Sequence, residues 1–259
     1  MIFYKVTSII YKFYFILAKL FKIKYIYSMY QVFLKSNFND STFIFYISGS
    51  YGFEFSNYLK NQKQTNIFLD IGANQGLYSL LASKNHSINK VYSFEPITST
   101  YNLLKANLIK NGFLDKCKIY NYGIGTFNKK VKFIVDSTHS GNAAILKNVQ
   151  RINKNHSLFK EKIINFEELN KLIEFNPNDK IGIKIDTEGS ELDILQTLSL
   201  SKFWINVTWI HIEMDGSLSY LKKIYEIMKN HNFIIKKKII PFVNLTHDNS
   251  PYYDIIFVR

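Results

Sequence analysis

The chain contains 259 residues, carries a formal net charge of +13 and is 47% hydrophobic. This length and composition allow one large domain, or one domain with an appendage, around a sizeable core. The single cysteine, Cys117, excludes an internal disulfide framework and a cysteine-rich metal site. We therefore expect a protein of a reducing compartment, located in the cytoplasm or, alternatively, at the inner membrane surface.

The positive charge favours acidic partners such as nucleic acid, phosphorylated metabolites or anionic lipid. The basic residues are scattered, however, and the one lysine triple, at 236–238, falls within a predicted strand or its edge. No RNA-binding signature is present in the sequence. We therefore predict that the protein does not bind nucleic acid.

The first predicted element is an amphipathic basic helix. Residues 1–39 contain no Asp or Glu, and Lys5, Lys12 and Lys19 recur every seven residues on one face. Lysines interrupt every long apolar run, which argues against a transmembrane span. We expect this helix to pack on the core or on a second subunit, giving a homo-oligomer. The alternative is peripheral contact of residues 1–35 with an anionic membrane.

The remaining elements indicate an α/β protein. Residues 40–65 predict a short strand or hairpin at 43–47 and a short helix at 54–61. From Asn66 onward, strands and helices alternate, which is typical of a doubly wound sheet. The predicted strands cover 66–70, 90–95, 117–122, 181–186, 207–213, 233–239 and 253–258, with a hairpin at 130–135 and 142–146, and the predicted helices cover 166–175, 189–198 and 217–231.

The segment NIFLDIGANQGLYSLLAS, residues 66–83, predicts a buried strand, a glycine-rich turn and a helix. This geometry brings a nucleotide-like ligand to a helix N-terminus. Asn74 stands where a dinucleotide motif needs glycine, and Asp70 ends the strand. An acid there repels a pyrophosphate and favours a cation. S-adenosylmethionine (SAM), which carries an ammonium and a sulfonium, therefore fits better than NAD.

A second acid supports a nucleoside ligand. VYSFEP predicts another short buried strand, and it ends at Glu95, 25 positions after Asp70. This separation corresponds to about one strand–helix–strand unit. An acid at the tip of the second strand can accept hydrogen bonds from both ribose hydroxyls.

Two later segments place further acids at the same edge of the sheet. In KIGIKIDTEGSELDIL, Asp186 ends a strand, and Glu188 and Glu191 follow at a helix start, where acids also offset the helix macrodipole. One strand later, WIHIEMDG places His211 and Glu213 on one strand face, with Glu213 at the tip. Open α/β sheets bind ligands at this edge.

DIGANQG, SFEP, NYGIG, KIDTEGSELDIL and IHIEM occur in this order, and together they resemble an FkbM-type SAM-dependent methyltransferase from about Glu54 to Arg259. The resemblance implies the class I SAM methyltransferase fold, a Rossmann-like doubly wound seven-stranded sheet with an antiparallel last hairpin. It also implies methyl transfer to oxygen. We divide the chain into an N-terminal amphipathic helical extension, residues 1–50, and a methyltransferase domain, residues 51–259.

The resemblance also implies roles for individual residues at the cofactor site. Asp70, Gly72, Asn74 and Gly76 are expected to form the methionine pocket, Glu95 to hold the ribose, and Asn121 and Gly123 to lie near the adenine. Ser140, Gly141 and Asn142 match a segment that the family places facing the pocket. Asp186, at the same sheet edge, is expected to serve both cofactor binding and chemistry.

The residue that removes the acceptor proton is left open among Asp186, Glu188, His211 and Glu213. A neutral histidine has a suitable pKa of about 6.5, whereas a carboxylate needs its pKa raised by burial. In a second version, Asp186 and Glu213 hold Mg²⁺, which acidifies a hydroxyl.

The expected acceptor is a hydroxyl of a sugar, nucleotide-linked or in a glycan, in surface-polysaccharide or secondary-metabolite biosynthesis. Lys129, Lys130 and Lys132 on the predicted hairpin would suit an anionic diphosphate carrier. The alternatives are an RNA methyltransferase, which the net charge favours, and a non-catalytic binding protein on the same fold.

Overall fold

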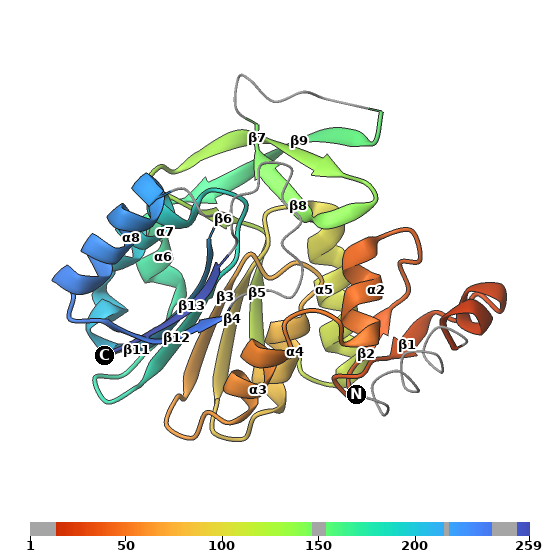
Figure 1. The fold of residues 1–259 in the computed structure, drawn as a ribbon, viewed down its shortest axis with the longest axis horizontal. Coiled ribbons are helices and arrows are strands. Elements are labelled where there is room, and N and C mark those ends of the chain that lie inside the picture. The colour runs from red at the N-terminus through yellow and green to blue at the C-terminus, as the bar shows by residue number, and fades with distance from the viewer. Residues whose placement is uncertain (1–13, 147–153, 215–217, 240–252) are drawn as a thin grey trace.

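The computed structural model describes residues 14–146, 154–214, 218–239 and 253–259. Its centre is a seven-stranded sheet (Figure 1). The strand order is β12 (Ile234–Ile239), β13 (Tyr253–Val258), β11 (Val207–Met214), β10 (Ile181–Ile185), β3 (Ile67–Ile71), β4 (Lys90–Phe94) and β5 (Cys117–Tyr120). β13 runs antiparallel to β11 and β12, and the strands from β11 to β5 are parallel. This confirms the predicted doubly wound sheet with an antiparallel last hairpin.

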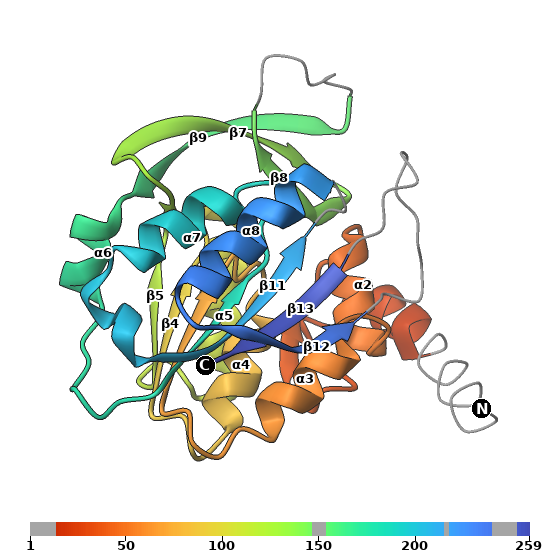
Figure 2. The same cartoon turned by 60° about the vertical axis from the view of Figure 1, so that its left-hand side comes forward.

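Helices cover both faces of the sheet (Figure 2). One face carries α6 (Phe166–Leu172), α7 (Glu191–Ser199) and α8 (Leu218–Asn230), and the other carries α3 (Phe53–Lys60), α4 (Leu77–Lys84) and α5 (Thr98–Asn111). Neighbouring strand residues point to opposite faces, so Leu69 packs in the first apolar cluster and Phe68 in the second. A short 3₁₀ helix, η1 (Lys202–Asn206), precedes β11.

A smaller sheet lies across the carboxyl ends of the parallel strands (Figure 1). Its order is β6 (Gly123–Ile124), β9 (His156–Ile164), β7 (Lys129–Asp136) and β8 (His139–Ile145). The predicted hairpin is present as β7 and β8. The sequence reading missed β9, which pairs antiparallel with the whole of β7. Ala144 of β8 forms an isolated bridge with Glu188, so this sheet reaches the loop after β10.

The segment before the central sheet is only partly helical. Residues 14–20 form a helix, and β1 (Tyr25–Tyr27) and β2 (Phe33–Lys35) then form a two-stranded antiparallel ribbon. The first 13 residues of the predicted amphipathic helix lie outside the described residues. Ala18, Ile26 and Leu34 are buried in the same apolar cluster as the side chains of α3 to α5. The division of the chain at residue 50 stays a prediction.

The strand or hairpin predicted at 43–47 is wrong, because α2 (Ser41–Ser48) occupies these residues. Asp40 caps the helix by accepting a hydrogen bond from the backbone N–H of Thr42, and Gly49, with φ of +66°, ends it. The aromatic residues that suggested a strand are buried at helical spacing, as at Phe43 and Tyr46. The helix predicted at 54–61 is confirmed as α3.

Within the part of the chain that the structure describes, no helix combines the length and apolar character needed to cross a membrane.

Candidate active site

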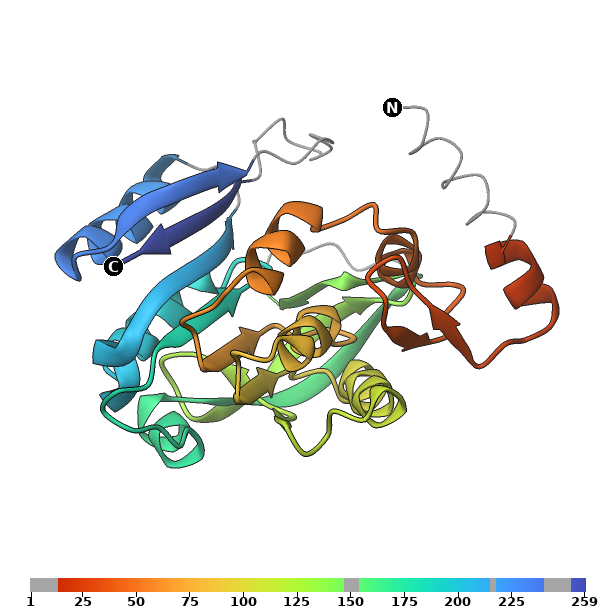
Figure 3. The ribbon, with the colours of Figure 1, turned by 90° about the horizontal axis from the view of Figure 1, so that it is seen from below.

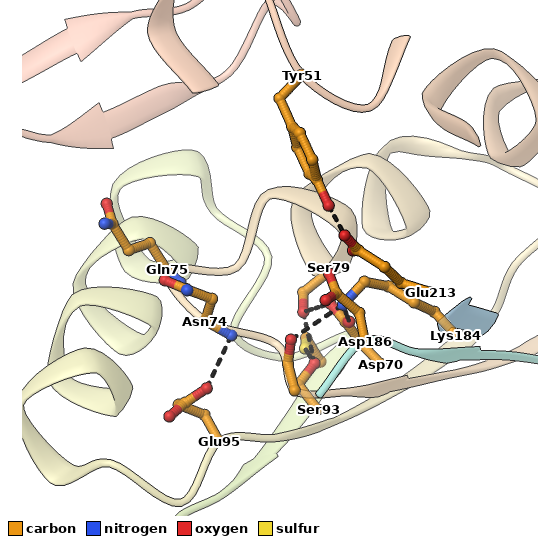
Figure 4. Close-up of polar contacts among 12 residues, drawn as sticks. Tyr51, Asp70, Asn74, Gln75, Ser79, Ser93, Glu95, Lys184, Asp186 and Glu213 are labelled. Carbon is orange, nitrogen blue, oxygen red and sulfur yellow. Dashed lines mark hydrogen bonds and ion pairs between the residues drawn. The ribbon is translucent and has the colours of Figure 1, made fainter. Parts of the chain in front are cut away.

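Charged side chains from three neighbouring strands meet at the carboxyl edge of the sheet (Figure 4). In the register of the strands, Asp70 of β3 lies beside Lys184 of β10, and Lys184 lies beside His211 of β11. Asp186 and Glu213 come two residues later, on the same strand faces and nearer the edge. The structure therefore brings together Asp70, Asp186, His211 and Glu213, as the sequence predicted.

Lys184 is the cation at the centre of this cluster, and the sequence analysis did not single it out. Its side chain is 1% exposed, and its Nζ lies 3.2 Å from Asp70 Oδ1 and 3.2 Å from Asp186 Oδ2. Nζ also donates a hydrogen bond of 2.9 Å to the carbonyl of Gly72. Two carboxylates share one ammonium, so the cluster keeps a net negative charge suited to a cationic ligand.

Asp70 is fully buried beneath the turn that follows β3. Its Oδ2 accepts a hydrogen bond of 2.6 Å from the hydroxyl of Ser79, and that hydroxyl lies 2.7 Å from Ser93 Oγ. With Lys184 on its other oxygen, both carboxylate oxygens of Asp70 already have partners. Asp70 therefore supports the turn from below, and the structure gives it no exposed surface toward a ligand.

The turn from Gly72 to Gly76 is held close to the end of β10. Gly72 has φ of +73°, and a Cβ there would lie 1.9 Å from the carbonyl oxygen of Asp186. The position therefore requires glycine both for its conformation and for this close approach. Asn74 also has a positive φ, +49°, which asparagine tolerates better than most residues. The structure thus explains the glycine at position 72 by the close packing of this turn on the end of β10.

Glu95 follows β4 and reaches this turn. Its Oε2 accepts a hydrogen bond of 2.9 Å from the backbone N–H of Asn74, and its Oε1 accepts one of 2.9 Å from Ile97. Burial raises the pKa of Glu95 to about 7, and the two backbone hydrogen bonds oppose that shift. Each carboxylate oxygen keeps a lone pair for a hydroxyl donor.

Two other residues predicted at the cofactor site, Asn121 and Gly123, contact protein groups in the structure. Asn121 donates to the carbonyls of Glu95 and Pro96, so its amide secures the end of β4. Gly123, in β6, is partly buried, and a Cβ there would lie 3.3 Å from Ile163.

β8 contacts the turn after β3 through one residue of the predicted small-residue segment. Ser140 donates a hydrogen bond of 3.0 Å to Asn74 Oδ1. Gly141 donates its backbone N–H to Thr42 Oγ1, and Asn142 is exposed.

A buried network that the sequence analysis missed ties three distant segments together. Asp40 Oδ2 accepts a hydrogen bond of 2.7 Å from Gln75 Nε2, and Asp40 Oδ1 accepts one of 3.1 Å from the backbone N–H of Ser140. Asn107 of α5 donates to the carbonyl of Gln75. The residues just before α2 therefore hold the turn that the sequence assigned to the cofactor.

Asp186 and Glu213 form a carboxyl pair at the strand ends. Burial pushes the pKa of Asp186 upward, but the Lys184 charge and a hydrogen bond with Glu213 outweigh it and lower the pKa below its usual value. For Glu213, burial and then the charges of Asp186 and Asp254 raise the pKa well above its usual value. The pair therefore holds one proton on Glu213 while Asp186 is ionised.

Tyr51 contacts this carboxyl pair through its hydroxyl group. Its hydroxyl donates a hydrogen bond of 2.5 Å to Glu213 Oε2 (Figure 4). Burial raises the pKa of Tyr51 well above 10, so the phenol stays protonated and remains a donor. Tyr51 comes from the segment between α2 and α3 and carried no recognisable sequence signal.

His211 lies deeper than Glu213. It is 2% exposed, and its ring stacks on Phe55 at a centroid distance of 3.8 Å. Its Nε2 is 3.5 Å from Asp254 Oδ1. Burial, followed by the Lys184 charge, lowers the pKa of His211 to about 3. A base of that strength, and without surface exposure, is poorly suited to take a proton from an acceptor.

Two further sequence candidates lie in the loop after β10 and at the start of α7. Glu188 is partly buried, and Glu191 accepts hydrogen bonds from Thr187 Oγ1 and from Tyr220. Glu191 therefore serves the helix start. Among the described residues, no group of three or more His, Cys, Asp and Glu side chains is arranged to hold a metal ion.

The site residues fit SAM in two respects. The buried Glu95 carboxylate has capacity for hydroxyl donors, and the Asp70–Lys184–Asp186 cluster keeps a net negative charge for a cation. The same cluster would disfavour the pyrophosphate of NAD.

Solved structures support the fold. Trm5b from Pyrococcus abyssi matches with a TM-score of 0.51 and 12% identity, over 88% of this chain and 53% of that one. The complex of aTrm5 with tRNALeu matches with a TM-score of 0.50 and 13% identity, over 88% and 50%. This chain thus spans about half the length of these two proteins. At such identities the likeness shows the fold alone.

M. capricolum TrmK, in complex with S-adenosyl-homocysteine (SAH), matches with a TM-score of 0.48 and 14% identity, over 81% of this chain and 69% of that one. No curated protein matches the sequence. Residues 70–235 match the family described as the methyltransferase FkbM domain, and they include the turn, Glu95, Asp186 and Glu213. The chain therefore belongs to the FkbM methyltransferase family and is a SAM-dependent methyltransferase.

Proposed function

We propose that this methyltransferase acts on a hydroxyl of a sugar, either linked to a nucleotide or within a glycan, in surface-polysaccharide or secondary-metabolite biosynthesis. The observation that carries the proposal is the Asp186–Glu213 carboxyl pair beside the Gly72 turn. A hydroxyl must lose its proton as it gains a methyl group, and Glu213 of this pair can take that proton when it is ionised. The resemblance of the motifs to FkbM-type enzymes supports oxygen as the acceptor atom.

In this proposal, the turn from Gly72 to Gly76 and the Glu95 carboxylate hold the cofactor. SAM supplies an electrophilic methyl group on its sulfonium when it is bound. Lys184 acts as a positioning residue, because it fixes the Gly72 carbonyl and the Asp186 carboxylate from below. Asn121 and Gly123 flank the same strand ends and stay the predicted neighbours of the adenine.

Glu213 is the proposed general base in its ionised form. Burial and the Asp186 charge raise its pKa, which makes its carboxylate a stronger base than an exposed one. Tyr51 orients the carboxylate by donating to Oε2. The charge of Asp186 raises the pKa of Glu213. The Asp186 side chain is 26% exposed, so an acceptor can reach it. The buried His211 keeps a positioning role, and Glu188 stays a candidate contact to the acceptor.

A magnesium-assisted version stays an alternative. Asp186 and Glu213 supply oxygen atoms, but one of the two carboxyls holds a proton in the pair described above. Metal binding would have to displace that proton, so it would strengthen as the pH rises. Turnover that survives chelator treatment would favour proton removal by Glu213, and turnover restored only by added Mg²⁺ would favour the metal.

Lysines on the smaller sheet support an acceptor with an anionic carrier. β7 and β9 place Lys130 opposite Lys162 and Lys132 opposite Lys160. Like charges in direct cross-strand pairs repel each other, so a bound phosphate or diphosphate would stabilise this face. These lysines lie on the face away from the apolar cluster of Phe133 and Ile163. We therefore propose that the carrier, not the reacting sugar, contacts this face.

The test is SAM turnover with a panel of nucleotide-sugars, the matching free sugars and an RNA pool, at two salt concentrations. The proposal predicts turnover on nucleotide-linked sugars, weakened by salt because the lysines act through charge. Turnover only on RNA would support the RNA methyltransferase alternative. SAM binding without turnover on any acceptor in the panel would favour a non-catalytic binding protein.

A further inference from the structure

A surface formed by residues 16–24 exposes large apolar side chains beside lysines. Ile16, Leu20 and Phe21 are 60%, 70% and 71% exposed, and Ile23 is 38% exposed. Lysines in the same stretch are also exposed. We call this the basic apolar surface, and its members are Ile16, Lys19, Leu20, Phe21, Lys22, Ile23 and Lys24.

The opposite side of the same helix is anchored to the protein. Ala18 is fully buried, and the ring of Phe15 packs edge-on against Phe38 at a centroid distance of 5.4 Å. Phe38 in turn packs against Phe43 of α2. Because Phe15 and Ala18 face inward, Ile16 and Leu20, one helical turn apart, face outward together. The exposure therefore follows from how the helix is docked.

The end of the helix is held in a defined turn. Ile23 donates its backbone N–H to the carbonyl of Ala18 at 2.9 Å, and Lys22 donates to Lys19 at 3.2 Å. Lys22 has φ of +51°, as the left-handed residue of this capping motif requires. Glycine is usual at that position, so Lys22 adopts a conformation that is locally strained for a residue with a Cβ.

The neighbouring ribbon extends this surface. Tyr27 and Phe33 pair across β1 and β2, with ring centroids 5.0 Å apart, and they are 45% and 37% exposed. Lys110 of α5 lies 5.0 Å from the Phe33 ring. The helix and the ribbon lie at the opposite end of the molecule from β12 and β13 (Figure 3).

The charge of this region indicates which partner docks on the basic apolar surface. Residues 1–39 contain no Asp or Glu, so no acid within that segment can pair with its lysines. We propose that the basic apolar surface docks on an anionic lipid bilayer, with the apolar side chains at the acyl boundary and the lysines at the headgroup phosphates. Lysine side chains can run along apolar surface while their ammonium groups stay in the headgroup layer.

A second copy of the chain is a poorer occupant. In a two-fold symmetric contact the same surface meets itself. The lysines would then face lysines, with no acid from residues 1–39 to separate them. Anionic headgroups supply the missing charge and leave the apolar side chains in contact with lipid.

The experiment is co-sedimentation of the full-length protein with vesicles of phosphatidylcholine alone and with vesicles containing about 30% phosphatidylglycerol. The apolar variant is Leu20→Ser with Phe21→Ser, and the charge variant is Lys19→Gln with Lys22→Gln. The matched control is Leu200→Ser with Ile205→Ser, because those side chains are 63% and 80% exposed elsewhere on the surface. Circular dichroism and SAM binding verify that each variant is folded.

The proposal predicts binding to the anionic vesicles only, falling steeply when salt is raised from about 0.1 to about 0.5 M. The apolar variant and the charge variant should each bind about tenfold more weakly or worse, and the control should bind like the parent. Absence of binding to anionic vesicles would overturn the proposal, as would equal binding by the apolar variant. Light scattering that shows a dimer for the parent and a monomer for the apolar variant would assign the surface to a second copy instead.

Discussion

The ammonium group of Lys184 lies 3.2 Å from the carboxylate of Asp186, two residues further along the same chain segment. The same nitrogen pairs with Asp70 and donates a hydrogen bond to the carbonyl oxygen of Gly72, its third partner. One buried cation therefore connects the proposed catalytic carboxyl pair to the turn assigned to the cofactor. Removing the charge of Lys184 should therefore lower both the free energy of unfolding and the rate of methyl transfer.

Replacement Lys184→Met keeps an unbranched side chain, one atom shorter, and removes its charge. The buried carboxylate of Asp70 and the partly buried carboxylate of Asp186 would then lack their shared cation. We expect a loss of about 3–5 kcal/mol in the free energy of unfolding. Because the Lys184 charge lowers the pKa of Asp186, that pKa should rise as well. Chemical denaturation measures the first effect. The control is Lys180→Met, an exposed lysine just before β10, and equal losses in the two variants would contradict the role of Lys184.

Tyr51→Phe should move the acid limb of the pH–rate profile to higher pH. The Tyr51 hydrogen bond lowers the pKa of Glu213, so its removal raises that pKa further. Turnover requires ionised Glu213, and a higher pH is then needed to ionise it. The profile of kcat against pH checks this, with Tyr58→Phe on α3 as the control. An unmoved acid limb would mean that Glu213 is not the titrating base.

SAM binding should weaken as the pH falls through about 7. Burial raises the pKa of Glu95 to about 7, so acid protonates the carboxylate that is expected to accept the ribose hydroxyls. Glu95→Ala should lose about 1.5–3 kcal/mol of binding free energy for each charge-assisted hydrogen bond, and Glu95→Gln should remove the pH dependence. Calorimetric titration at several pH values measures both. Equal affinity of the parent and Glu95→Ala for SAM would mean that Glu95 only caps the end of β4.

Asp40→Ala should loosen the turn that holds the cofactor, although Asp40 lies outside the family match. It would leave the backbone N–H of Ser140 without its acceptor, and Gln75 Nε2 would keep only the hydrogen bond of 3.2 Å to Ser140 Oγ. It would also remove the cap of α2. We expect a loss of about 1–3 kcal/mol in the free energy of unfolding together with weaker SAM binding. Thermal denaturation with and without SAH measures both, and Asp115→Ala, at an exposed acid, is the control. If SAH raises the melting temperature of Asp40→Ala as much as that of the parent, Asp40 does not support the cofactor site.

The central sheet and its acidic edge were predictable because both are encoded locally. Buried strands appear as short apolar runs, and the residue after each run marks the same edge of a parallel sheet. Asp70, Glu95, Asp186 and Glu213 could be placed in this way. The separate roles of these four acids could not be predicted. Whether an acid faces a ligand or a buried lysine depends on the neighbouring strand.

Lys184, Tyr51 and the Asp40 network escaped prediction for a related reason. A lysine between isoleucines suggests an outward-facing strand residue, and only its register beside Asp70 shows that it is buried. Asp40 and Ser140 are 100 residues apart and meet only in three dimensions. At α2 the signals were present, in Asp40 before and Gly49 after the helix, but the aromatic content outweighed them in the sequence reading.

The most direct test of the account is mass spectrometry of the acceptor after incubation with SAM carrying a labelled methyl group, using parent, Glu213→Gln and the exposed control Glu226→Gln. The account predicts one labelled methyl on a sugar hydroxyl with the parent and with Glu226→Gln, and loss of the label with Glu213→Gln while SAH binding persists. Label found in RNA instead of sugar, or full labelling by Glu213→Gln, would contradict it.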